Sequence, residues 1–202
     1  MMKASSDSVP ENVQIQALES LRKTILTGMI RSAGMISEFL HEGFDCSLQD
    51  AGAYSPTVLA RRITRDEQTL AGVHLTIHGQ LTGSLLMLFS TSHASQLIRF
   101  LLRQTHPVDL NVESQHSALK EVGNIFTSRV LSNLEEQIGL RALPEPPMFL
   151  SGTWDQVQQL CQEGTGDGGI RVQGHLSCAS PAGCFEGIVL LQARKSLLGE
   201  ED

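Results

Sequence analysis

The stretch that decides the fold runs from Ser117 to Pro147 and reads SALKEVGNIFTSRVLSNLEEQIGLRALPEPP. Successive residues of a helix are separated by about 100° around its axis, so residues three and four positions apart share a face. The apolar residues of this stretch are spaced in that way: Leu119, Val122, Gly123, Phe126, Val130 and Leu134. The stretch therefore predicts a long amphipathic helix whose apolar side packs on a core.

The opposite side of the predicted helix carries a polar stripe within an arc of roughly 80°. Its members are Ser117, Glu121, Asn124, Ser128, Ser132 and Glu135. A polar stripe is ordinarily a solvated helix face, and we expect this one to face outward.

A second long helix is predicted upstream, from about Val13 to Leu40. When Ala17 is placed on Ala118, apolar positions of the two helices coincide: Leu21 with Val122, Ile25 with Phe126 and Met29 with Val130. The chain is therefore predicted to be a single domain, residues 1–202, built from two diverged repeats at 13–106 and 113–195.

Each repeat continues with an extended segment broken by proline, a short helical run and two strands. The extended segments are Cys46–Ser55, followed by Pro56, and Arg141–Ser151. The strands are Leu70–His78 and Gly83–Phe89 in one repeat, and Ile170–Ser177 and Phe185–Gln192 in the other, with a further helix over Ser92–Gln104. Such units can pair into a largely antiparallel sheet with both long helices on one face, an α+β sandwich with pseudo-two-fold symmetry.

Composition excludes several classes of function. The chain has 202 residues, 41% of them hydrophobic, which is enough for one sizeable core. Its apolar runs, such as Leu85–Phe89, are far shorter than the roughly 20 residues of a membrane span, and no secretory signal opens the chain. We therefore expect a cytoplasmic protein without membrane insertion.

A net charge of −7 without clustered Lys or Arg argues against a nucleic-acid partner.

The cysteines and histidines do not predict a metal site. Cys46, Cys161, Cys178 and Cys184 lack zinc-like spacing, and we expect buried, reduced thiols. His74 and His78 would lie roughly 13 Å apart on one strand, too far to share a metal ion.

The pattern Ser117-x3-Glu121-x2-Asn124-x22-Pro147, together with the run ALKEVGNI, resembles the phosphatase signature of the CheC/CheX/FliY family of chemotaxis proteins. The resemblance covers about Gln115 to Pro147 and is architectural elsewhere. It implies a hydrolase that removes the aspartyl phosphate of a CheY-like response regulator. That regulator would bring its own phosphoaspartate and Mg²⁺, so we expect no cofactor in this chain.

The resemblance also implies roles for the motif residues. Asn124 would orient the attacking water by accepting and donating hydrogen bonds, and Glu121 would pair with the active-site lysine of the regulator. Ser117 would support the acid or contact the regulator. Ser128 and Ser132 would keep the docking stripe free of bulky side chains, and Pro147 would shape the strand that follows it.

The first repeat has no intact copy of the motif. Gln16, Ser20 and Lys23 stand at the positions of Ser117, Glu121 and Asn124 when the core positions are matched. Matching the acid instead puts Glu19 on Glu121 but Arg22 on Asn124, and a guanidinium cannot accept a hydrogen bond from water. We predict one active site per chain, where some relatives have two.

An alternative from another functional class stays open. The same fold could serve as a non-catalytic interaction module, similar to the middle domain of the flagellar switch protein FliM or to an adaptor that binds the CheD deamidase. The retained Glu121 and Asn124 favour catalysis, because a binding surface does not require that pair at that spacing.

Overall fold

The computed structural model describes residues 11–40, 43–49, 58, 61, 69–102, 112–162 and 170–195. The predicted break at Pro56 and the predicted end of the first repeat at residue 106 lie outside these ranges, so the domain boundaries stay predictions.

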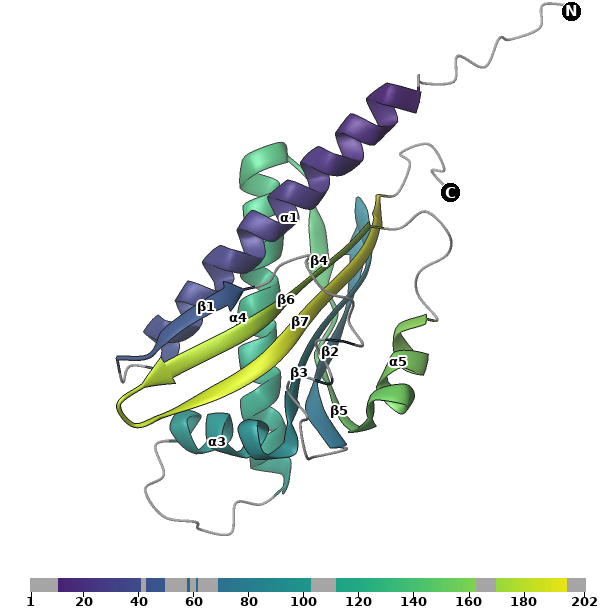
Figure 1. Ribbon diagram of the computed structural model, residues 1–202. Helices are drawn as coiled ribbons and strands as arrows, with labels where there is room; N and C mark the ends of the chain where they lie inside the picture. Colours follow the sequence, from purple (N-terminus) through teal and green to yellow (C-terminus); the bar gives the residue numbers. More distant parts are fainter. Residues whose placement is uncertain are drawn as a thin grey trace, which may run out of the picture.

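Two long helices, α1 (Glu11–Leu40) and α4 (Val112–Ile138), form where the sequence predicts them. They pack against each other and against one face of the sheet (Figure 1). The helix predicted after the first hairpin is α3 (Thr91–Leu101), and the short α5 (Trp154–Gln162) follows in the second repeat. Among the helices that the structure describes, none is long and apolar enough to cross a membrane.

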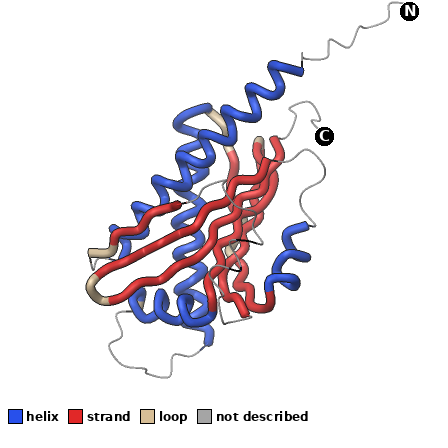
Figure 2. The backbone as a smooth tube through the Cα atoms, in the orientation of Figure 1, coloured by secondary structure: helices blue, strands red, loops and turns tan. Residues whose placement is uncertain are grey.

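One sheet contains all the described strands, and every described pairing between them is antiparallel. The strands are β1 (Asp45–Gln49), β2 (Thr69–Gly79), β3 (Leu81–Ser90), β4 (Ala142–Pro144), β5 (Met148–Thr153), β6 (Ile170–Ser180) and β7 (Gly183–Lys195). The order is β1-β6-β7-β3-β2-β4, and β5 pairs with the part of β2 that β4 leaves free. Figure 2 shows the two long hairpins twisting side by side.

The sheet has the predicted pseudo-two-fold arrangement. β2 begins at residue 69 and ends at 79, whereas β6 begins at 170 and ends at 180, an offset of 101 at both ends. The hairpins β2–β3 and β6–β7 meet through the pairing of β3 with β7. The outer strands are exchanged between repeats, because β1 pairs with β6 and β5 pairs with β2. Neither repeat therefore completes its part of the sheet alone.

The centre of the sheet is buried on both faces. On one face the main core lies under α1 and α4, with Ile25, Met29, Phe126 and Val130 fully buried. On the other face Val157 of α5 covers a smaller cluster, to which Trp154 adds its ring. That cluster contains Leu70, Leu86, Leu88, Ile188 and Leu190. Burial on both faces explains why β3 is an almost continuous apolar run rather than an alternating one.

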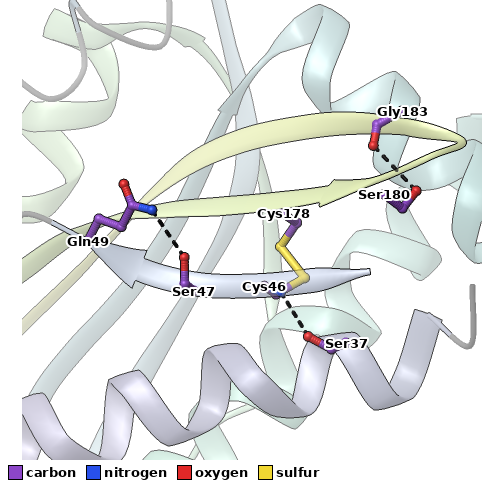
Figure 3. The surroundings of a disulfide bond; sticks show 7 residues. All are labelled: Ser37, Cys46, Ser47, Gln49, Cys178, Ser180 and Gly183. Carbon is purple, nitrogen blue, oxygen red and sulfur yellow. Dashed lines mark hydrogen bonds between the residues drawn. A yellow bond between two sulfur atoms is a disulfide. The ribbon is translucent and has the colours of Figure 1, made fainter. Parts of the chain in front are cut away.

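The expectation of reduced thiols is wrong for Cys46 and Cys178, which form a disulfide bond (Figure 3). The two cysteines are buried and lie directly opposite each other on β1 and β6. Because they are separated by 132 residues, only the pairing of β1 with β6 brings them together. The N–H of Cys46 also donates to Oγ of Ser37, at 2.9 Å, so β1 is attached to α1 as well. Cys184 is a free thiol as expected, but it is exposed, so the expectation of burial is wrong for this residue.

Candidate functional site

The polar stripe of α4 faces solvent. Ser117, Glu121, Ser128 and Ser132 are exposed, and Asn124 is half-buried at the edge of the stripe. Glu121 and Asn124 are three residues apart, so their side chains are neighbours on the helix surface, with β-carbons about 5–6 Å apart. Both can therefore touch one small region of a partner.

The functional groups of Glu121 and Asn124 have no side-chain hydrogen bond or ion pair with any residue that the structure describes. The acids at the other end of α4 differ. Glu135 lies 3.0 Å from the guanidinium of Arg141, and Glu136 lies 3.7 Å from that of Arg129. The motif acid thus remains available to a cation that is supplied by a partner.

The helix is held close to the sheet beside the motif. Gly123 lies directly against the side chain of Val73, and a β-carbon at this glycine would also lie 3.4 Å from Cδ1 of Leu75. Both contacts belong to β2. A glycine inside a helix is unfavourable unless packing requires it, and here the close approach of α4 to β2 requires it.

The strand that follows Pro147 lies along the side of α4. Phe149 of β5 stacks on the imidazole of His116, with ring centroids 3.6 Å apart and an angle of 16° between the planes. Both rings are partly exposed. The motif of the sequence did not include either ring, and no spacing rule could have paired them, because the contact depends on the exchanged strand β5.

The corresponding part of α1 is exposed but chemically different. Gln16, Ser20 and Lys23 all face solvent, as do Glu19 and Arg22 of the alternative alignment. No Glu in α1 is followed three residues later by Asn.

A separate titratable cluster lies on the sheet face opposite α4. Nε2 of His78 is 2.8 Å from Oε1 of Glu145, and this hydrogen bond lowers the pKa of the carboxyl group. Burial lowers the pKa of His74 on the same strand, although the charge of Glu145 partly opposes the shift. Within the described ranges, no three His, Cys, Asp or Glu side chains are grouped so that they could hold a metal ion.

No protein-family model matches the chain. Its sequence is 25% identical, over 168 residues, to the CheY-P phosphatase CheC of Bacillus subtilis. The matched region covers 78% of this chain and 79% of CheC.

Solved structures of chemotaxis and flagellar proteins share the fold. FliY of Thermotoga maritima matches with a TM-score of 0.60 and 12% identity, covering 82% of this chain and 84% of that one. The CheX–CheY–BeF3–Mg²⁺ complex of Borrelia burgdorferi contains a chain that matches at 0.57 and 15% identity, covering 83% and 96%. The FliM middle domain of H. pylori matches at 0.54 and 15% identity, covering 91% and 94%.

The molecule thus has the helix and antiparallel-sheet fold of this group of chemotaxis proteins. The similarity to CheC supports the relationship that the α4 motif indicates, and the chain shares the fold of CheX and FliY.

Proposed function

We propose that this protein is a phosphatase that hydrolyses the aspartyl phosphate of a CheY-like response regulator in chemotaxis signalling. The observation that carries the proposal is the outward position of Glu121 and Asn124 on α4, side by side and without partners among the described residues. The similarity to the CheY-P phosphatase CheC supports the same class of substrate. Because the proposed substrate is a cytoplasmic regulator, the protein would also lie in the cytoplasm.

In this proposal, Asn124 orients the attacking water. Its carboxamide oxygen accepts a hydrogen bond from the water and its NH₂ group donates one, which fixes the water in line with the phosphorus atom. Because Asn124 is half-buried, fewer side-chain conformations are open to it than to a fully exposed residue. A ~100-fold gain in rate requires that the activation free energy fall by about 2.7 kcal/mol, and positioning of the reactants can supply this for phosphoryl transfer.

Glu121 is the docking acid of the proposal. Its exposed carboxylate would pair with the active-site lysine of the regulator and set the register of α4 on the partner. Ser117 lies one turn before Glu121 and would support this contact, while Ser128 and Ser132 would let the regulator approach the helix closely. The regulator would supply both the phosphoaspartate and its Mg²⁺, so the reaction needs no cofactor from this chain.

A non-catalytic interaction module is the second candidate, and two observations favour it. The FliM middle domain has the same fold, and α1 contains no Glu followed three residues later by Asn. In that case α4 would bind a regulator, or CheD, without hydrolysis.

Phosphate release from a phosphorylated CheY-like regulator separates the two candidates. The wild-type protein should accelerate release, Asn124→Ala should lower kcat by about 100-fold, and Glu121→Ala should mainly raise KM. The matched controls are Ser20→Ala and Lys23→Ala, at the equivalent positions of α1, which should act as the wild type does. If the wild type binds the regulator but leaves its dephosphorylation rate unchanged, the interaction-module function replaces the enzyme.

A further inference from the structure

The parts of the motif lie on two different elements. Ser117, Glu121 and Asn124 belong to α4, whereas Pro147 directly precedes β5. β5 is held in the sheet by β2, a strand of the other repeat. The position of Pro147 relative to Asn124 therefore depends on how β5 packs against α4.

The register of the sheet locates Pro147 along α4. Phe149 lies opposite Val73, and Val73 contacts Gly123 of the helix. Pro147 directly precedes β5 and stands two residues before Phe149, about 7 Å along an extended segment. At the next step of the ladder, Leu75 also approaches Gly123. Continuing the register of β5 by one step beyond Met148 puts Pro147 opposite Leu75, the second β2 residue near Gly123.

A ring contact joins α4 to β5, because His116 of α4 stacks on Phe149 of β5. His116 is the residue before Ser117, and seven residues separate it from Gly123, about 10 Å along the helix axis. The helix is thus fixed at two levels, to β5 by the ring stack near Ser117 and to β2, the strand that pairs with β5, by the packing at Gly123 near Asn124.

We propose that His116 is a positioning residue, whose stack on Phe149 holds the Pro147 end of β5 beside Asn124. A docking regulator then meets one rigid surface that α4 and Pro147 form together. This inference rests on the proposed function, because it concerns docking of the same regulator. The ring matters through its flat surface, so a phenylalanine at this position should replace the histidine.

The experiment measures binding and turnover of the same variants. One probe is a CheY-like regulator charged with beryllofluoride and Mg²⁺, for the dissociation constant, and the other is the phosphorylated regulator, for kcat and KM. His116→Ala and Phe149→Ala should each raise the dissociation constant and KM by about 5- to 10-fold, with kcat within about twofold of wild type. His116→Phe should return both to within about twofold of wild type.

A double-mutant cycle tests whether the two rings act as a pair. The double variant of His116→Ala and Phe149→Ala should bind no more weakly than either single variant, because both changes remove one contact. Asn133→Ala is the structural control, since it weakens the packing of α1 on α4 away from β5. It should lower the free energy of unfolding without raising the dissociation constant.

The outcomes separate this inference from the proposed function. If the wild type binds the charged regulator and His116→Ala weakens binding, while no variant releases phosphate, only the phosphatase activity is overturned. If the wild type releases phosphate and His116→Ala binds and reacts as the wild type does, only the positioning role is overturned. If His116→Phe is as impaired as His116→Ala, the stacking argument fails, and a wild type that does not bind the regulator at all overturns both proposals.

Discussion

Gly123 of α4 lies directly against Val73 of β2, with no room between them for a β-carbon. Among the described glycines, Gly123 is the one at which α4 comes closest to the sheet, and it directly precedes Asn124. The level of the motif carboxamide above the sheet is therefore set by the absence of a side chain at residue 123.

Gly123→Ala should force α4 away from β2. Overpacking of this kind lowers the free energy of unfolding by roughly 1–3 kcal/mol. Because the helix is displaced, the variant should also accelerate phosphate release from the regulator less than the wild type does. Denaturant unfolding measures the first effect. Gly34→Ala is the matched control, because Gly34 is an exposed glycine inside α1 with open space at its β-carbon. It should stabilise the protein by about 0.5–1 kcal/mol, and a similar gain for Gly123→Ala would contradict the argument.

Asn133 joins the two long helices. Its buried Oδ1 accepts a hydrogen bond from Nη1 of Arg31, at 2.8 Å, and its Nδ2 donates to the carbonyl oxygen of Thr24, at 3.3 Å. Asn133→Ala removes both bonds and should lower the free energy of unfolding by about 1–3 kcal/mol. Gln137→Ala, on the exposed side of the same helix, should change it by less than about 0.5 kcal/mol. Equal losses for the two variants would show that Asn133 contributes nothing specific.

Sequence periodicity was sufficient for the parts of the fold that depend on neighbouring residues. The long helices, the hairpins and the outward direction of Glu121 and Asn124 follow from local spacing, and the structure has them in these positions. The exchange of β1 and β5 between repeats could not be predicted, because strand register is decided by residues far apart in the chain. The Cys46–Cys178 bond and the His116–Phe149 stack both depend on that exchange, so both were missed.

Reduction of the Cys46–Cys178 bond should destabilise the protein. The bond closes a loop over a sequence separation of 132 residues, and loss of a constraint on a loop of this size typically costs 2–5 kcal/mol, with about 5 kcal/mol from the chain-entropy model. Denaturant unfolding with and without dithiothreitol measures the change. Cys184→Ala, at the exposed free thiol, should leave the difference between the two conditions unaltered.

The double variant of Cys46→Ala and Cys178→Ala should unfold at the same denaturant concentration whether or not reductant is present. Thiol titration of the unfolded protein verifies that reductant releases two further thiols in the wild type. If these thiols are released and the midpoint of unfolding does not move, the bond contributes no stability.

The stability of the fold should fall as the pH is lowered through the range in which His74 titrates. Burial lowers the pKa of His74 in the folded protein below its usual 6.5, so the unfolded chain takes up this proton first. The free energy of unfolding should therefore be highest above pH 6.5 and decrease below it, until the folded protein is protonated as well. His74→Gln should flatten this part of the profile, measured by denaturant unfolding between about pH 7.5 and 5. Glu145→Gln should steepen it, because the charge of Glu145 partly opposes the lowering of the His74 pKa. A wild-type profile that matches that of His74→Gln over this range would show that His74 does not carry the dependence.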